Sequence, residues 1–549
     1  MNTEEMAKKD WEWLFNDFSR VLRQNEVSYG DSRKGVWQVF DYSTEDFSGK
    51  LILAQPDSNA PDVRIKIPLQ GTYEIYLGLF QNFCDRIKVK LNTDNVFERL
   101  RHSSKIANKQ SFEDVYWKTE NLDGKKEIII RHEKGIRAAV GYVMARKPQR
   151  KKYSKEYLIH LTDDGFPSNY GIPDDIDDAC WNIIACARIK PDFVSRGINP
   201  TSMADYPTRY QSQRRSPEKI LKTEFPGEIY RQCYETLAKF FKKNENVHQR
   251  YFEIARKSGI KPLAYCRMAM YHANPPWDCF RSDFYDAHPE FRCIDIDGIP
   301  VNRMSFAYPE VRQEFIKLFT EAIEFGAQGV TCCFVRGFPF VCYEEPVKKR
   351  FKDVYKQDIT KLPETDRRAE KIRSEFVTQF MRELRDALND TGKNSVLIVA
   401  IVHANEDDCW YYGLDVKTWI KEGLIDILCP YTWTIEGEPA EIDMKFFSNV
   451  VRKSSVKLLP FLGSLYNDKN PVNFLKRAIE MTNYPVDGFS FWDGVDVRTD
   501  PVFHMLIEGL VSKKAIKETM EKLEKFPTYR TVITLQGTKV NKHSYGMAL

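Results

Sequence analysis

Hydrophobic and polar residues change their spacing along the chain, and the first change marks a region of short strands. From Trp37 to about Ala145, extended runs such as VRIKIPL and TYEIYLGLF alternate with Gly, Asp and Asn. Several of these runs place an apolar residue at every second position, which is the pattern of half-buried strands. The region over residues 36–147 therefore predicts an all-β sandwich domain.

Beyond a basic linker, RKPQRKKYSK, strand and helix patterns alternate eight times over residues 155–511. The predicted strands are short apolar runs, at Tyr157–Leu161, Asp192–Arg196, Pro262–Arg267, Gly329–Val335, Val396–Val402, Ile425–Cys429, Lys457–Leu462 and Gly488–Trp492. The intervening amphipathic helices include Ile176–Ile189, Pro309–Phe325, Asp366–Leu388 and Pro471–Met481. Eight alternations favour a (β/α)8 TIM barrel over an open doubly wound sheet. The predicted fold class is therefore α/β, a barrel preceded by a sandwich.

Both ends of the chain carry further patterns. Within residues 1–35, an apolar stripe at helical spacing predicts an amphipathic helical segment, and its members are Trp11, Leu14, Phe15, Phe18 and Leu22. Residues 512–549 predict a helix over Ser512–Phe526, followed by a C-terminal tail. The tail contains an extended stretch, TYRTVITLQG, that we expect to join an existing sheet.

Composition narrows the classes of partner. The chain has 549 residues, with 82 basic and 78 acidic residues that give a formal net charge of +4. This balance gives no electrostatic reason to expect nucleic acid as a partner. No apolar run approaches the roughly 18 residues that a membrane helix needs, and no signal peptide is recognisable. We expect a cytoplasmic protein, although an exported form whose signal has been removed would look the same.

The cysteines predict neither a metal nor a disulfide framework. The chain has 12 of them, without a Cys-x-x-Cys motif or a Cys/His spacing typical of zinc. Several lie inside apolar runs, where cysteine is a small buried residue in a reducing compartment. We expect no metal and no cofactor.

One stretch, AQGVTCCFVRGFPFVCYEEPV over residues 327–347, combines a buried strand with charged residues. The strand ends at Arg336, and two adjacent carboxylates, Glu344 and Glu345, follow it. The carboxyl ends of barrel strands form the active site in this fold. An Arg–Glu ion pair that holds a loop is the alternative interpretation.

The other predicted strand ends carry similar chemistry. Their candidate residues are Asp163 and Asp164 after the first strand, Arg267 at the third, His403 at the fifth, Tyr431 and Trp433 at the sixth, and Trp492 and Asp493 at the eighth. Acids, aromatic rings and guanidinium groups are what a pyranose ring requires, because acids cleave the glycosidic bond while rings and forked donors bind the sugar.

We assign roles to these residues as hypotheses. Glu344 is the predicted general acid, Asp493 the second carboxylate, and Glu345 the substitute for its neighbour. The predicted substrate-binding residues are Asp163, Asp164, Arg267, Arg336, His403, Tyr431, Trp433 and Trp492. Each has a structural alternative: Glu344 could anchor a loop, Asp493 could cap a helix, Asp163 and Asp164 could form a turn, His403 could be structural, and the rings could fill the barrel.

A resemblance to a known family rests on several motifs. The pattern FVRGFPFVCYEEPV, the opening HLTDDGFPS and the closing FWDGVD resemble bacterial glycosyl-hydrolase-like proteins of the family-10-like type. The resemblance covers roughly residues 155–510 and implies a sugar-processing barrel, with Arg336, Glu344 and Asp493 at the matching positions. Xylanase-type barrels place their nucleophilic Glu after the seventh strand, whereas this sequence has Gly463 and Ser464 there.

Together these observations predict a glycoside hydrolase that acts on an oligosaccharide or glycoconjugate by carboxylate acid/base catalysis. A carbohydrate is the expected partner, with no nucleic acid and no membrane. A non-catalytic carbohydrate-binding barrel is one alternative. A lyase or a metal-dependent enzyme that acts on sugar acids is another.

Overall fold

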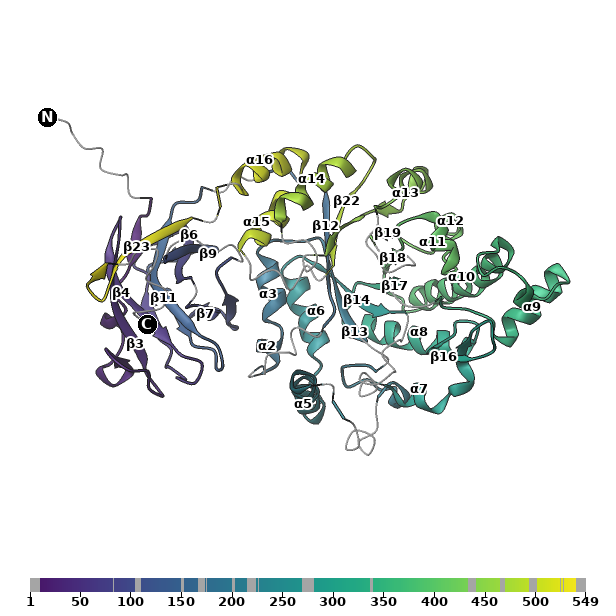
Figure 1. Ribbon diagram of the computed structural model, residues 1–549, viewed down its shortest axis with the longest axis horizontal. Coiled ribbons are helices and arrows are strands. Elements are labelled where there is room, and N and C mark those ends of the chain that lie inside the picture. The colour runs from purple at the N-terminus through teal and green to yellow at the C-terminus, as the bar shows by residue number, and fades with distance from the viewer. Residues whose placement is uncertain are drawn as a thin grey trace. The chain divides into compact units, whose positions relative to one another are not determined.

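The structure is a computed structural model, and it describes residues 10–81, 83–103, 110–149, 153–165, 173, 175–199, 203–214, 224–225, 227–268, 281–335, 339–432, 441–464, 470–492, 501–523, 525–526 and 528–539. The chain divides into two compact units. Unit 1 comprises Met1–Ser154, Val497–Gly509 and Lys517–Leu549, and unit 2 comprises Lys155–Asp496 and Leu510–Ile516. Figure 1 shows both with their elements labelled.

Unit 1 is built on two sheets with mostly antiparallel pairing. The larger has the strand order β2-β3-β4-β11-β6-β9-β23-β24, with β1 paired to β11, and the smaller has the order β5-β10-β7-β8. The strands of the larger sheet are β1 (Trp13–Phe15), β2 (Val27–Ser28), β3 (Trp37–Thr44), β4 (Ser48–Ala54), β6 (Gln70–Phe80), β9 (Ser111–Asp123), β11 (Ala138–Arg146), β23 (Tyr529–Leu535) and β24 (Thr538–Lys539). Those of the smaller sheet are β5 (Val63–Lys66), β7 (Ile87–Leu91), β8 (Glu98–Leu100) and β10 (Glu127–Arg131).

One apolar core joins the two sheets of unit 1. It contains side chains of the larger sheet, such as Leu51 and Leu53, together with side chains of the smaller sheet, such as Val63 and Ile128. Four consecutive residues of β4, Leu51 to Ala54, belong to this core, so both faces of that strand are buried there.

The predicted N-terminal helix is wrong. In the described part of that segment, Trp13–Phe15 forms strand β1, with Trp13 opposite Ala145 and Phe15 opposite Val143 of β11. A short 3-10 turn follows, and it buries Phe18. The apolar residues pack against the core of unit 1, as the helix prediction required, but backbone pairing with β11 overrides the local helical pattern.

The C-terminal extended stretch joins the larger sheet, as the sequence predicts. Tyr529 of β23 lies opposite Glu113 of β9, and Leu535 lies opposite Tyr42 of β3. Strand β23 thus bridges β9 and the early strand β3.

Unit 2 contains a parallel sheet with the order β20-β19-β18-β17-β14-β13-β12-β22-β21. Its strands are β12 (Leu158–Asp163), β13 (Phe193–Asn199), β14 (Lys261–Arg267), β17 (Gly329–Cys333), β18 (Leu397–Val402), β19 (Ile427–Pro430), β20 (Lys457–Leu458), β21 (Phe461–Ser464) and β22 (Gly488–Trp492). All eight predicted strands are present, and the seventh is divided into β20 and β21.

The division of the seventh strand matters because β20 and β21 are the two ends of the sheet. Leu459 and Pro460 separate them in the chain. The N–H of Leu459 donates to the carbonyl of Leu428 at 2.9 Å, and the carbonyl of Pro460 accepts from the N–H of Ser490 at 2.9 Å. This short segment therefore bonds to the β19 side and to the β22 side of the sheet.

Helices lie outside the strands of unit 2 (Figure 1). They are α2 (Ile176–Ala179), α3 (Trp181–Ala187), α5 (Glu228–Lys243), α6 (Val247–Lys257), α7 (Asp283–Ala287), α8 (Pro309–Glu324), α9 (Glu345–Tyr355), α10 (Arg367–Asn389), α11 (Glu406–Tyr411), α12 (Val416–Lys421), α13 (Met444–Val451) and α14 (Pro471–Met481). The helix predicted over Ile176–Ile189 is interrupted at Cys180. An antiparallel hairpin, β15 (Arg292–Ile294) with β16 (Pro300–Met304), precedes α8 and was not predicted.

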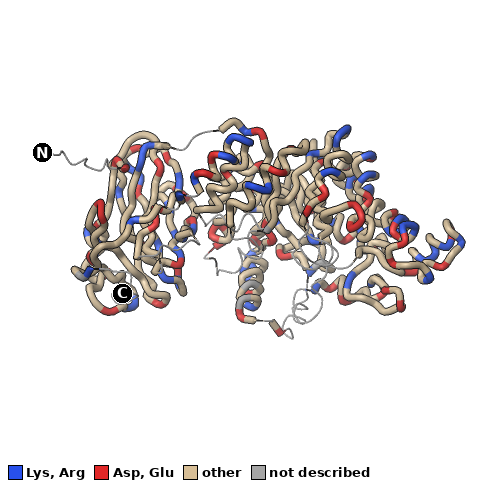
Figure 2. Tube along the Cα trace, turned by 45° about the horizontal axis from the view of Figure 1, so that its top comes forward, with Lys and Arg blue, Asp and Glu red and all other residues tan. Residues whose placement is uncertain are grey.

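Two helices at the C-terminal end are α15 (Pro501–Gly509) and α16 (Lys513–Leu523), the second within the predicted Ser512–Phe526. Among the helices in the described part of the chain, none combines the length and the apolar character that a membrane crossing requires. Figure 2 shows basic and acidic residues interspersed along the trace of each unit.

Candidate active site at the strand ends

An acidic and a basic side chain meet at the carboxyl ends of β12 and β14. The guanidinium of Arg267 donates to Oδ2 of Asp164, and both side chains are largely buried. The other carboxylate oxygen of Asp164, Oδ1, is buried and has no hydrogen-bond partner in the described part of the chain. A buried polar atom without a partner is costly, so its presence marks a position where a ligand or water can bind.

Two glycines allow the ends of β12 and β13 to approach each other. A Cβ on Gly165, whose φ is +89°, would lie 2.9 Å from the carbonyl oxygen of Gly197, and a Cβ on Gly197 would lie 2.5 Å from that of Asp164. Glycine is therefore required at both positions. The Asp-Asp-Gly turn of the sequence is what holds Asp164 at this edge.

Asp163, the neighbour of Asp164, has a different environment. It is fully buried, and its carboxylate accepts from Arg196 at 2.8 Å, from Asn182 at 3.0 Å and from the N–H of Gly165 at 2.9 Å. Asp163 therefore holds the strand ends together, and the structure gives it a positioning role in place of the predicted contact with substrate.

The ion pair of Asp163 extends into a buried network. Nε of Arg196 donates to Nδ1 of His248 at 3.4 Å, and Nε2 of His248 lies 2.6 Å from Oδ1 of Asp205. Since Nδ1 accepts, we assign the proton of the ring to Nε2, which donates to Asp205. Burial opposes the charge of Arg196, but Asp163, Tyr251 and Asp205 outweigh it and raise the pKa of Arg196 above its ordinary value.

Further polar atoms near these strand ends lack partners. Both amide atoms of Asn199, at the end of β13, are buried without a hydrogen-bond partner among the described residues, and so is Oδ2 of Asp205. In the sheet, Asn199 lies opposite Cys266, which directly precedes Arg267. Unsatisfied donors and acceptors therefore collect at the carboxyl ends of β12 and β13, close to the end of β14.

Aromatic rings lie beneath Arg267. Its guanidinium lies 5.6 Å from the ring centre of Trp492, which lies 5.0 Å from Tyr431 and 6.2 Å from Tyr265. Trp492 is 1% exposed and Tyr431 is 2% exposed, and both belong to the apolar cluster inside the sheet. In the described conformation these rings are packed in the apolar cluster, where they support Arg267. They therefore do not form an open platform on which a sugar ring could stack.

The charge of Asp164 reaches one of these rings. Burial raises the pKa of Tyr265 well above its ordinary value, and the negative charge of Asp164 raises it further. Tyr265 is thus a neutral phenol beneath the carboxylate. Sequence reasoning missed it because its side chain lies in the middle of a predicted strand.

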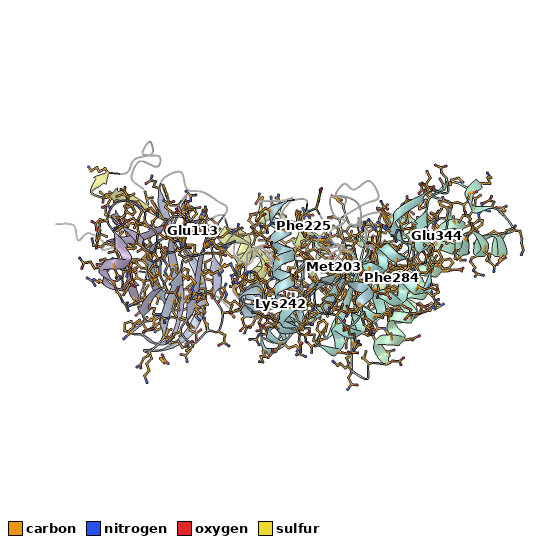
Figure 3. All side chains as sticks on the ribbon, turned by 90° about the horizontal axis from the view of Figure 1, so that it is seen from below. Glu113, Met203, Phe225, Lys242, Phe284 and Glu344 are labelled. Carbon is orange, nitrogen blue, oxygen red and sulfur yellow. The ribbon has the colours of Figure 1, made fainter. Side chains whose placement is uncertain are left out.

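Glu344, the predicted general acid, lies elsewhere in unit 2. In the view of Figure 3, the label of Glu344 lies nearer to that of Phe284 than to that of Phe225. Glu344 is 0% exposed, and it directly precedes the first residue of α9. Its oxygens accept from the N–H of Ile294 at 3.1 Å and from the N–H of Cys342 at 2.9 Å. Backbone donors thus hold this carboxylate, which favours the loop-anchoring alternative over the predicted role as general acid.

Two other predicted residues also have contacts away from Asp164. The side chain of Glu345 is 84% exposed and pairs with Lys348 at 3.0 Å on the surface of α9. His403 is fully buried, and its ring stacks on Tyr412 at a centre-to-centre distance of 3.9 Å. The structure therefore groups Asp164, Arg267, Tyr431 and Trp492, whereas the carboxylate of Glu344 contacts the backbone of Ile294 and Cys342.

Three predicted site residues lie outside the described residues: Arg336, Trp433 and Asp493. Asp493 directly follows Trp492, the last residue of β22. Arg196, His248, Asp205 and Asn199 were not predicted. For Arg196 and Asn199 a signal existed, because Arg196 ends the second predicted strand and Asn199 follows it by three residues.

No protein-family model matches the chain, and no curated protein matches it either. The sequence resemblance to the family-10-like proteins is therefore not supported by a family match. The structure, however, is similar to solved structures of the glycoside hydrolase class.

Three such structures are the glycoside hydrolase domain of PgaB (BpsB) from Bordetella bronchiseptica, α-galactosidase TtGalA from Thermus thermophilus, and α-L-fucosidase isoenzyme 2 from Paenibacillus thiaminolyticus. The first is 11% identical, with 65% of this chain and 99% of that chain covered and a TM-score of 0.44. The second is 10% identical, with 93% and 100% covered and a TM-score of 0.35. The third is 12% identical, with 68% and 50% covered and a TM-score of 0.39. At these values the likenesses assign neither a residue role nor a substrate.

Proposed function

We propose that this chain is a glycoside hydrolase that acts on an oligosaccharide or glycoconjugate at the carboxyl ends of its parallel strands. In this proposal the sheet of unit 2 is a closed (β/α)8 barrel, because its end strands β20 and β21 are separated by two residues, Leu459 and Pro460. In the same proposal, the two sheets of unit 1 form the predicted sandwich.

One observation carries the proposal: Asp164 pairs with Arg267 through one oxygen and leaves the other without a partner. Asp163, which holds the strand ends together, is by contrast bonded through both oxygens. The pair offers an acceptor from Asp164 beside the forked donors of Arg267, and this combination suits the adjacent hydroxyl groups of a sugar.

Hydrolysis of a glycosidic bond needs an ionised carboxylate and a protonated one. Asp164, ion-paired with Arg267, supplies the ionised group, as nucleophile or as the base that activates water. Asp493 is the proposed acid, because it directly follows Trp492 in the chain and Trp492 underlies Arg267. Glu344 takes no part in this proposal, because backbone donors hold its enclosed carboxylate.

The experiment is a glycan panel in which both binding and the release of reducing ends are measured. On any substrate found, Asp164→Asn is expected to lower kcat/KM by about 100-fold or more, in the range typical of acid/base groups. The matched control is Asp85→Asn, since Asp85 also pairs with an arginine, Arg137, but on the surface of unit 1.

The control is expected to keep wild-type kcat/KM. Full activity of Asp164→Asn would remove the assignment of the site. Binding of glycans without release of reducing ends would replace hydrolysis with carbohydrate binding, which is the alternative that the sequence leaves open.

A further inference from the structure

Three potential metal ligands meet outside the site described above. They are Cys293 on β15, Cys342 in the segment before α9, and Glu344 at the start of α9. Their two sulfur atoms and one carboxylate oxygen all lie within 4.8 Å of one another. The cluster therefore draws on a hairpin, a loop and a helix start, which only the fold brings together.

The two thiols point to one place. Sγ of Cys293 lies 4.0 Å from the carbonyl oxygen of Pro339, and Sγ of Cys342 lies 3.9 Å from the same atom. Cys293 and Glu344 are buried, whereas Cys342 is partly exposed. The cluster thus has an enclosed side and one side, at Cys342, through which an ion can enter.

The carboxylate is oriented as a metal-ligating carboxylate is. The N–H groups of Ile294 and Cys342 hold it, at 3.1 Å to Oε1 and 2.9 Å to Oε2 respectively. A carboxylate has about four lone-pair sites, so these bonds leave acceptor capacity toward the sulfur atoms. Hydrogen bonds of this kind orient the ligands of metal sites. Within the described residues, no lysine, arginine or histidine forms an ion pair with Glu344.

We propose that Cys293, Cys342 and Glu344 bind one zinc-class divalent ion, with a fourth position left for water. Two sulfur donors exclude magnesium and calcium, which require oxygen ligands, and two thiolates with one carboxylate suit zinc. Tetrahedral zinc with such ligands separates them by about 3.5–3.8 Å. Small side-chain rotations close the cluster from its present spacing to these values.

The charges of the site balance when the ion is bound. Zinc binds thiolates, so binding releases the thiol protons to solvent and forms two metal–sulfur bonds. Two thiolates and one carboxylate carry three negative charges, and the divalent ion together with Arg303 carries three positive ones. Arg303 is buried next to the cluster, where it donates to the carbonyl of Pro339 at 3.2 Å.

The test is a cobalt titration of the full chain after removal of bound metal with a chelator and reduction of its thiols. We expect one Co2+ per chain, thiolate-to-cobalt charge-transfer absorption, and displacement of Co2+ by Zn2+. Cys293→Ala and Cys342→Ala are each expected to abolish the thiolate band, and Glu344→Gln to weaken Co2+ affinity by about 10-fold or more. The control Cys84→Ala removes a buried thiol of unit 1 and is expected to leave the band unchanged.

A second measurement on the wild-type chain does not depend on the folding of variants. Zn2+ is expected to slow alkylation of Cys342, mapped by mass spectrometry, at least 10-fold. Alkylation of unrelated cysteines is expected to stay the same. The absence of cobalt binding, a thiolate band that survives both alanine variants, or equal alkylation with and without Zn2+ would overturn the proposal. So would a Cys293–Cys342 disulfide that forms at the same rate whether or not Zn2+ is present.

Discussion

Two aspartates, Asp114 buried in unit 1 and Asp164 partly buried in unit 2, form different bonds to arginine. In unit 1, Oδ1 of Asp114 accepts from Tyr142 and from Nε of Arg530 at 3.1 Å, and Oδ2 accepts from Arg146 and from Nη2 of Arg530 at 3.1 Å. In unit 2, Asp164 bonds to Arg267 through Oδ2 alone.

The difference separates a charge that maintains the fold from one that is available to a ligand. Arg530 of β23 also pairs with Asp10 and Asp46. The cluster around Asp114 therefore links the segments that contain Asp10, Asp46 and Arg530. A fully bonded polar network fixes one arrangement of the segments that it joins. An incompletely bonded one, such as that of Asp164, retains capacity for a substrate, and the following predictions test this distinction.

The largest effect is expected from Asp114→Ala. Removal of this carboxylate leaves two arginines, Arg146 and Arg530, in a buried cluster, so unit 1 should lose about 5 kcal/mol of unfolding free energy. Urea unfolding measures the loss. Asp85→Ala, which removes an exposed ion pair with Arg137, serves as the control and should cost no more than about 1 kcal/mol. Equal losses of unfolding free energy in the two variants would contradict the role of Asp114 in maintaining the fold.

A smaller effect should separate the neighbours Asp163 and Asp164. Asp163→Asn removes the charge that compensates the buried Arg196, and it should destabilise unit 2 by about 3 kcal/mol. Asp164→Asn should cost less, about 1 kcal/mol, because the pair with Arg267 is partly exposed and an amide oxygen can still accept from the guanidinium. Thermal unfolding of both variants checks this, and a larger loss for Asp164→Asn would reverse the assigned roles.

The smallest effect concerns pH and Glu133 in unit 1. Burial raises the pKa of Glu133, but Arg99 and Arg86 outweigh it and hold the pKa below its ordinary value. A lowered pKa in the folded state stabilises the protein above the ordinary value, about 4.3, and this contribution is lost as the pH falls through the lowered value.

Glu133→Gln should therefore cost about 1 kcal/mol near pH 7, and the difference from wild type should shrink below pH 4. Urea unfolding of both proteins between pH 7 and pH 3 tests this. A difference that stays constant over the whole range would show that the ion pairs of Glu133 do not contribute in the expected way.

Local sequence predicted the strands of the parallel sheet in unit 2 because each of these strands has its own signal. The eight strands of unit 2 are short apolar runs bounded by turn residues, and buried parallel strands require such runs. Prediction from local sequence failed for the N-terminal segment, because Trp13–Phe15 pairs with β11, which lies more than 100 residues away in the chain. A local pattern holds no information about such a partner.

The sequence by itself determined that acids and aromatic residues would lie at the ends of parallel strands, because the position of a residue along its strand sets the edge at which it lies. Only the tertiary structure decided which of these side chains are available to a ligand. Asp163 and Asp164 are neighbours, yet successive side chains at a strand end point to opposite sides, so one meets Arg196 and the other Arg267. Cys293 and Cys342 are likewise distant in sequence and meet only because a hairpin packs against the start of α9.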